Sequence, residues 1–167
     1  MITLDLTQVL HPEAADYSED RMQAEFEQLA PEIQEYVEKY YSTRIFNIGD
    51  GTISFSEHEA RKCALMYWDA LEFAAKVDQH LRKHRGDKYD FEISIDETSS
   101  PTLPAHHLFI IMELQRRGVT VNSLAPRFIG EFQKAVDYIG DIEEFERQFR
   151  IHTDIAKAHS DYKISVH

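Results

Sequence analysis

Four short segments in which apolar and polar residues alternate are separated by longer segments with helical periodicity. Alternation with a period of two is typical of β-strands, and apolar residues spaced three and four apart are typical of helices that pack on a sheet. The predicted strands cover residues 2–6, 91–96, 119–125 and 162–166. Strands that alternate with helices predict an α/β fold, in which crossover helices join the strands of a parallel sheet.

The segment of about 18–90 is predicted to be a helical and hairpin insertion between the first two strands. Two helices are expected, one around residues 22–29 and one after Pro31. A short hairpin is expected at residues 44–55, with a turn at Gly49-Asp50-Gly51. A lone G-x-G of this kind predicts a turn and not a nucleotide-binding loop.

Four further helices complete the pattern. The longest begins at the capping box of Ser56 and Glu59 and is expected to end near Arg85. Another is opened by Pro104 and stopped by Gly118. A short helix at about residues 129–136 and a longer one from Asp141 lead to the last strand.

One face of each predicted strand carries polar side chains, and this decides between two arrangements of the sheet. A central strand of an open doubly wound sheet is buried on both faces, whereas a barrel strand can direct polar side chains into a shared interior. We therefore predict part of a (β/α)8 barrel of the TIM type with about four parallel strands. Since a complete barrel has eight strands and roughly 250 residues, residues 1–167 are expected to form a single domain that is a fragment of a larger barrel. The polar faces carry Thr3 and Asp5, then Glu92, Ser94 and Asp96, then Ser123 and Arg127, then Lys163, Ser165 and His167.

The acidic balance of the chain excludes several classes of partner. A net charge of −12 argues against nucleic acids and anionic membranes, because both require a basic surface. The single cysteine, Cys63, has no internal disulfide partner, and no apolar run approaches the ~20 residues that span a bilayer. No signal peptide is visible. We expect a cytoplasmic protein without nucleic-acid or membrane partners.

Residues at the carboxyl ends of the predicted strands are the strongest candidates for a functional role. Substrates of parallel α/β proteins bind at these ends, where the loops vary and the amino termini of helices point. The candidates are Asp5, Asp96, Glu97, Arg127 and His167. Carboxylates, a guanidinium and an imidazole at one edge fit a divalent-metal site for an anionic, oxygen-rich substrate such as a sugar acid or keto acid.

Several candidates also have a purely structural interpretation. Glu97 could cap the loop after its strand, and Arg127 could form a salt bridge with Asp96 instead of binding a substrate carboxylate. Glu92 and Lys163 lie deeper on the polar faces, where an ion pair inside the barrel is expected.

The histidines divide into two groups. His106 and His107 stand at the start of a helix, and one of them could reach the strand-end site, although packing or capping is the more common role. Other histidines fall on predicted helices and are expected at the surface: His58, His80, His84, His152 and His159.

The second half of the chain resembles the tagaturonate/fructuronate epimerase family. The resemblance is carried by F-E-I-S-I-D-E-T at 91–98, S-L-A-P-R-F-x-G-x-F at 123–132, V-D-Y-I-G-D at 136–141 and Y-K-I-S-V-H at 162–167. Residues 1–90 fit more loosely, with Thr3-Leu4-Asp5 where the family has a similar strand-end aspartate. The barrel of the family extends on both sides of these segments.

The resemblance implies a metal-dependent epimerase that interconverts tagaturonate and fructuronate by inversion at C4 of the keto-hexuronate. By matching position, Glu97 and His167 would be ligands of a divalent ion, whether zinc, manganese, iron or nickel. Our hypothesis gives Asp96 the proton transfer at the C4 hydroxyl and Arg127 the substrate carboxylate. Further substrate contacts are predicted for Asp5, His107 and Lys163. We also allow for a homo-oligomer.

The position of the inverted carbon favours a retro-aldol step. C4 lies β to the ketone, so its C–H bond is not acidified and simple deprotonation is not a plausible route. Breaking the C3–C4 bond leaves an enediolate, whose formation a Lewis-acidic ion can assist. Transient oxidation by a nicotinamide is the competing route, and the sequence has no dinucleotide fingerprint. The alternative functions are a class II-type aldolase or sugar isomerase on the same barrel, and a non-catalytic fragment that binds sugar acids.

Overall fold

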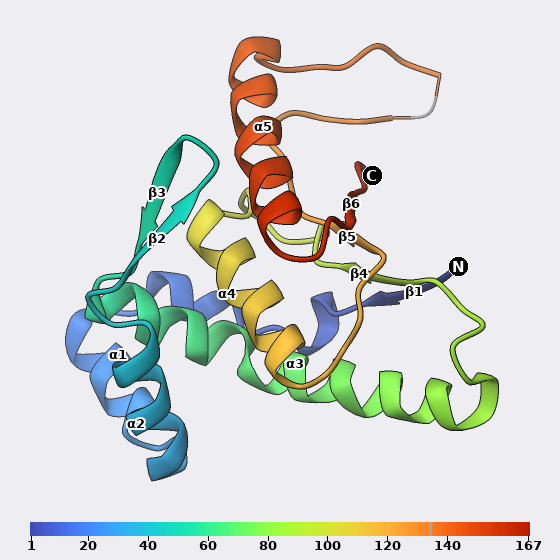
Figure 1. Cartoon of the computed structure of the whole chain (residues 1–167). Coiled ribbons are helices and arrows are strands. Elements are labelled where there is room, and N and C mark those ends of the chain that lie inside the picture. The colour runs from blue at the N-terminus through green and yellow to red at the C-terminus, as the bar shows by residue number, and fades with distance from the viewer. Residues whose placement is uncertain (134) are drawn as a thin grey trace.

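A computed structural model describes residues 1–133 and 135–167. Helices and strands alternate along the chain, as Figure 1 shows. In chain order the elements are β1 (Ile2–Asp5), the 3-10 helices η1 (Thr7–Val9) and η2 (Pro12–Asp16), α1 (Glu19–Phe26), α2 (Pro31–Tyr40), β2 (Ile45–Ile48), β3 (Gly51–Ser54), α3 (Glu57–Arg85), β4 (Phe91–Ser94), α4 (Pro104–Arg116), β5 (Ser123–Ala125), α5 (Ile142–Ala158) and β6 (Lys163–Ile164).

Strands β1, β4, β5 and β6 form one parallel sheet in which the order of strands follows the order of the chain. The prediction of four parallel strands with crossover helices is confirmed. Crossovers between parallel strands are right-handed, so a sheet that always adds its next strand on the same side carries its helices on one face. Helices α3, α4 and α5 accordingly lie on one side of the sheet (Figure 1). The polar side chains of the four strands lie on the opposite face of the sheet.

Helix α3 is the longest element, and both of its ends follow from local chemistry. The hydroxyl of Ser56 accepts a hydrogen bond from the backbone N–H of Glu59 at 3.1 Å, which satisfies one free donor of the first turn. Gly86 ends the helix at φ +59°, a conformation that costs glycine little. None of the helices in the described part of the chain combines the length and apolar character needed to cross a bilayer.

The segment between β1 and β4 is joined to α4 through a buried carboxylate. The side chain of Glu113 in α4 has no exposed surface, and it accepts hydrogen bonds from Tyr36 at 2.8 Å and Tyr41 at 2.7 Å. Arg116, at 2.9 Å, and Arg117 form ion pairs with the same carboxylate. Burial alone would raise the pKa of Glu113, but the hydrogen bonds from Arg116, Tyr41 and Tyr36 outweigh it and lower the pKa.

The predicted short helix at about 129–136 is wrong for the residues that the structure describes there, and Lys134 lies outside them. Instead, Glu131 and Ile139 form an isolated antiparallel bridge. Gly130 adopts φ +78°, and a Cβ at this position would come within 2.4 Å of the Tyr138 hydroxyl. A close approach that only glycine allows therefore replaces helical geometry here. The strands β5 and β6 are also shorter than the predicted segments 119–125 and 162–166.

Candidate active site

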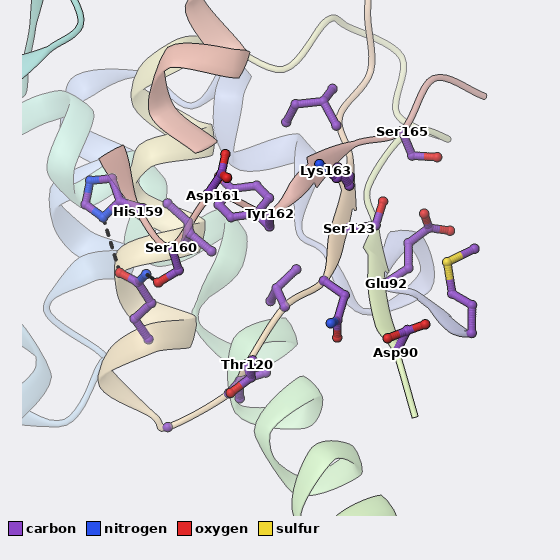
Figure 2. Close-up of a pocket in the computed structure, with 18 residues that line it drawn as sticks. Asp90, Glu92, Thr120, Ser123, His159, Ser160, Asp161, Tyr162, Lys163 and Ser165 are labelled. Carbon is purple, nitrogen blue, oxygen red and sulfur yellow. Dashed lines mark hydrogen bonds between the residues drawn. The ribbon is translucent and has the colours of Figure 1, made fainter. Parts of the chain in front are cut away.

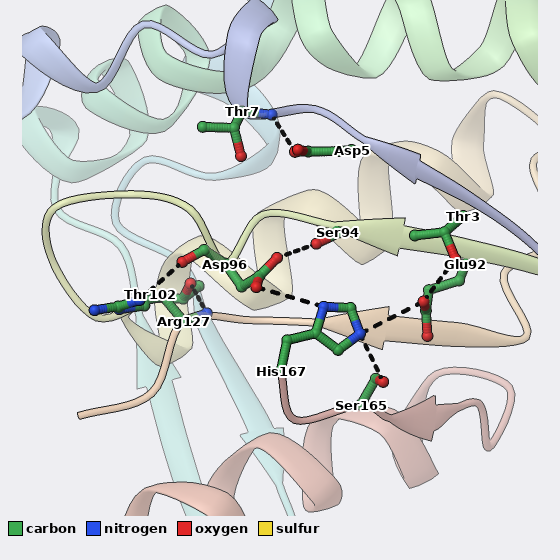
Figure 3. Close-up of polar contacts among 10 residues, drawn as sticks. All are labelled: Thr3, Asp5, Thr7, Glu92, Ser94, Asp96, Thr102, Arg127, Ser165 and His167. Atoms are coloured by element: carbon green, nitrogen blue, oxygen red, sulfur yellow. Dashed lines mark hydrogen bonds and ion pairs between the residues drawn. The ribbon is translucent and has the colours of Figure 1, made fainter. Parts of the chain in front are cut away.

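Asp96 and His167 meet beyond the carboxyl ends of β4 and β6 (Figure 3). Nδ1 of His167 lies 3.4 Å from Oδ2 of Asp96, and Oδ1 of Asp96 accepts a hydrogen bond from the hydroxyl of Ser94. On the other side of the imidazole, Oγ of Ser165 lies 3.0 Å from Nε2. The side chains of Asp96 and His167 are 18% and 36% exposed. The pair is therefore held by its neighbours and still open to a ligand.

Glu92 adds a second carboxylate one step deeper on the polar face. It is buried, its Oε1 accepts a hydrogen bond from Thr3 at 2.9 Å, and the same oxygen lies 3.6 Å from Nε2 of His167. Burial alone would raise the pKa of Glu92, but the neighbouring hydroxyls of Ser123, Thr3 and Ser165 and the nearby imidazole outweigh it and lower the pKa. An ionised carboxylate therefore faces the imidazole.

Arg127 is fixed through its backbone to the loop that follows β4. Its N–H donates to the Thr102 hydroxyl at 3.0 Å, and the Thr102 N–H donates to the Arg127 carbonyl at 2.8 Å. The guanidinium is exposed, and Nη1 donates to the backbone carbonyl of Asp96 at 3.4 Å. Among the described residues, Arg127 forms no salt bridge with the Asp96 carboxylate. Donors of the guanidinium therefore remain available to an anion.

Asp5, Glu97 and Lys163 are exposed. The carboxylate of Asp5 accepts a hydrogen bond at 2.8 Å from the backbone N–H two residues further on. Within the described residues, Lys163 forms no ion pair with Glu92, so the prediction of such a pair is wrong. The reason is geometric: His167 is the group that faces the Glu92 carboxylate.

The structure places His107 in the core and not beside these residues. Its Nδ1 lies 2.7 Å from Nδ1 of His152, and its Nε2 lies 2.5 Å from the Tyr162 hydroxyl. The expectation that His152 lies at the surface is wrong, because only 1% of it is exposed. The spacing of His152 from Phe149 and Ile155 puts it on the apolar stripe of α5, which is the signal that sequence reasoning missed.

The buried histidines are expected to make stability depend on pH. Burial and the neighbouring ring of His152 lower the pKa of His107, and burial lowers the pKa of His152 to about 4. Unfolded histidine has a pKa of about 6.5, so this stability is fully present above about pH 6.5 and is lost as the pH falls toward about 4. Urea unfolding across this range should show a steep fall in the free energy of unfolding. His80→Gln, which changes an exposed histidine, is the control and should leave the slope unchanged; a wild-type free energy that stays flat down to about pH 5 would contradict the prediction.

The side chains of Glu92, Asp96 and His167 together fit a divalent cation. An imidazole together with carboxylates is a ligand set that suits zinc, manganese, iron and nickel. Oε2 of Glu92 is buried and has no hydrogen-bond partner among the described residues. A buried carboxylate oxygen that is left unsatisfied calls for an unseen partner, and a cation is a suitable one.

A second group of side chains that could hold a metal ion lies between α3 and α4. The ligand atoms of Glu59, Cys63 and His106 all lie within 4.8 Å of one another. However, both ring nitrogens of His106 already have protein partners, Glu59 at 2.7 Å and the Tyr67 hydroxyl at 2.8 Å. Burial also raises the pKa of the Cys63 thiol well above its usual value. These observations favour a structural hydrogen-bond network over a metal site.

A large hollow of about 920 Å³ extends from the amino ends of the strands to the polar face of the sheet, where Glu92, Lys163 and Ser165 line it (Figure 2). Its walls include Asp90, which precedes β4, together with Thr120 and Asp161, which precede β5 and β6. It therefore opens at the amino ends of the strands, beside β6, the edge strand of the sheet. Asp96, Arg127 and His167 do not line it. Because parallel α/β proteins bind substrates at the opposite ends of their strands, we assign it no chemistry.

The fold and the cluster together define a class: an α/β protein with a strand-end site suited to anionic, hydroxyl-rich ligands. The chain belongs to the tagaturonate epimerase family, whose model, UxaE, matches residues 1–167.

Known relatives extend the comparison. The chain is 41% identical over 134 residues to the tagaturonate/fructuronate epimerase of Thermotoga maritima, which covers 80% of this chain and 28% of the relative. The crystal structure of the fructuronate-tagaturonate epimerase UxaE from Cohnella laeviribosi with one glycerol is 38% identical and superposes with a TM-score of 0.92. The native structure of that enzyme gives 0.91. Both comparisons cover 99% of this chain and 34% of the solved one, so the chain spans about a third of the length of these relatives.

Proposed function

We propose that this chain supplies substrate-binding and metal-binding residues to an enzyme that interconverts tagaturonate and fructuronate. The observation that carries the proposal is the strand-end cluster of Asp96, Arg127 and His167 in a member of the tagaturonate epimerase family. The names of the relatives from Thermotoga maritima and Cohnella laeviribosi support a keto-hexuronate as the substrate.

The sheet is proposed to be one arc of a (β/α)8 barrel. Two observations support this: the strand order follows the chain order, and the polar residues Thr3, Glu92, Ser123 and Lys163 are in register across all four strands. In a barrel, such a row forms one layer of the interior.

Each of the predicted site residues is proposed to have a distinct role. Arg127 binds the substrate carboxylate through its available donors, and the exposed side chains of Asp5 and Lys163 contact the sugar hydroxyls. Glu97 and His167 would hold the divalent ion. When bound, that ion supplies Lewis-acid polarisation of the substrate carbonyl. His107 is fully buried and reaches no ligand directly, so its contribution passes through its neighbours.

Asp96 is proposed to move the proton in a retro-aldol step. Its carboxylate accepts the proton of the C4 hydroxyl, the C3–C4 bond breaks, and C4 becomes an aldehyde carbonyl. The electron pair of the broken bond spreads over C3, C2 and the ketone oxygen as an enediolate. After the aldehyde turns its opposite face, the bond forms again and Asp96 returns the proton to the oxygen on C4. The hydrogen bond from Ser94 orients the carboxylate for both transfers.

Product analysis tests the function. The protein, expressed from its complete gene, is incubated with tagaturonate and a divalent ion, and fructuronate is expected. Release of three-carbon fragments as the main products would instead indicate an aldolase, an aldose product would indicate an isomerase, and no reaction would overturn the catalytic proposal. Removal of metal with a chelator should abolish turnover, and restoring the ion should recover it.

Fragment exchange tests the step separately. Cleavage of C3–C4 in a keto-hexuronate yields dihydroxyacetone and tartronate semialdehyde, so labelled dihydroxyacetone supplied with the semialdehyde should enter the keto-hexuronate pool. Fructuronate formation without such exchange, with the C4 hydrogen found on a nicotinamide, would overturn the retro-aldol step and leave the epimerase proposal intact.

A further inference from the structure

A continuous chain of buried polar contacts runs from the start of β6 into α5. The hydroxyl of Tyr162 lies 2.5 Å from Nε2 of His107, and Nδ1 of His107 lies 2.7 Å from Nδ1 of His152. The two imidazole rings are stacked, with their centroids 4.9 Å apart. All three residues are at most 5% exposed. Water is therefore largely excluded, and these groups depend on one another for hydrogen bonds.

The chain of contacts ends beneath the loops that carry Arg127. The backbone of Thr102 raises the pKa of His152 as a hydrogen-bond acceptor, in opposition to the larger lowering by burial. The ring of His152 also packs edge-on against Phe128, with the centroids 5.2 Å apart. Thr102 is joined to Arg127 by two hydrogen bonds, and Phe128 is the next residue in the chain. His152 thus contacts the residue that directly follows Arg127, and Arg127 presents the guanidinium.

The chemical nature of these residues argues against a role in packing alone. Phe145 and Phe149 lie on the same stretch of α5 and pack around Phe128. A phenylalanine at position 152 would continue that cluster without burying a polar ring, which is costly unless every hydrogen bond is satisfied. The imidazoles provide what a hydrocarbon cannot, a directional link between Tyr162 and the loop.

We propose that His152, oriented by His107 and Tyr162, is a positioning residue that holds Phe128, and with it Arg127 and its contact with Thr102, and so sets the affinity for a carboxylate-bearing sugar. The inference rests on the proposed function of Arg127. In this inference His107 acts by orienting His152, and it does not contact the substrate directly.

Two substitutions at one position test the inference. His152→Phe keeps an aromatic ring against Phe128 but loses the hydrogen bond with His107, whereas His152→Gln retains a side-chain amide that can form a hydrogen bond with His107. In the protein expressed from its complete gene, His152→Phe is expected to raise KM for tagaturonate by up to about ten-fold, the upper end of the effect of losing one neutral hydrogen bond. The expected change in kcat is smaller than that in KM. His152→Gln should restore KM toward the wild-type value, which a role in packing alone does not predict.

Arg127→Ala tests the proposed function separately from the inference. If Arg127→Ala leaves KM unchanged, Arg127 does not bind the carboxylate, and both the proposed role and the inference fail. If Arg127→Ala raises KM while a folded His152→Phe does not, only the positioning inference is overturned. Should His152→Phe fail to fold, Thr102→Val removes the hydroxyl that accepts from Arg127 and carries the same test, with Thr102→Ser as its rescue. Unchanged KM in Thr102→Val would overturn the inference.

Discussion

Asp96→Asn is expected to lower kcat for epimerisation by about two to four orders of magnitude, the range for loss of a general acid–base group. The amide has nearly the shape of the carboxylate and can still accept the hydrogen bond from Ser94. It cannot take the proton of the C4 hydroxyl, so the fall should lie in kcat and not in KM. Steady-state kinetics with tagaturonate, at saturating divalent ion, measure both constants.

Asp90→Asn is the matched control for this substitution. Asp90 is exposed and precedes β4, so it lies at the opposite end of the strand from Asp96. The same change of charge and shape is therefore made away from the cluster, and kcat should stay within about two-fold of the wild type, since a surface substitution away from special features has little effect. If Asp96→Asn retained most of the wild-type kcat, proton transfer would have to be assigned to another group. Glu92 would be the next residue to test, because it is the other carboxylate beside His167.

Periodicity carried most of the information about the fold. The parallel sheet, the long α3 and its capping box were predictable because period-two and helical patterns are local properties of the sequence. The segment 129–136 was mispredicted because its conformation depends on a contact that no local pattern encodes, the close approach of Tyr138 to Gly130. Strand ends shifted for the same reason, since pairing with a neighbour decides where a strand stops.

The candidate site was only partly predictable from the sequence. Asp96 and His167 lie close together because the carboxyl ends of parallel strands meet at one edge of the sheet. The partner that fixes Arg127 was not singled out, because the Arg127–Thr102 contact joins two separate loops. His107 illustrates the limit. The sequence places it at the start of a helix, but the side of that helix on which it lies depends on how α4 packs against α5.

Glu113→Ala is expected to destabilise the protein by ~3–5 kcal/mol, the range for removing one partner from a buried ion pair. The side chain of Arg117 is 9% exposed, so its guanidinium would be left without its carboxylate in the interior. The hydroxyl of the buried Tyr41 would lose its acceptor as well. Urea unfolding of wild type and variant measures the difference in the free energy of unfolding.

Two further variants separate the charge of Glu113 from its hydrogen bonds. Glu113→Gln keeps an acceptor for the tyrosine hydroxyls but removes the charge that faces Arg117, so its loss of stability should be smaller than that of Glu113→Ala. Glu144→Ala removes an ion pair with Arg147, whose side chain is 63% exposed, and should cause no measurable change because such surface pairs are screened by solvent. Equal unfolding midpoints for Glu113→Ala and the wild type would show that the segment between β1 and β4 does not depend on this carboxylate. Helix α2 would then have to be held by its apolar contacts, which include the buried Val37 and the aromatic contacts of Tyr36 and Tyr41.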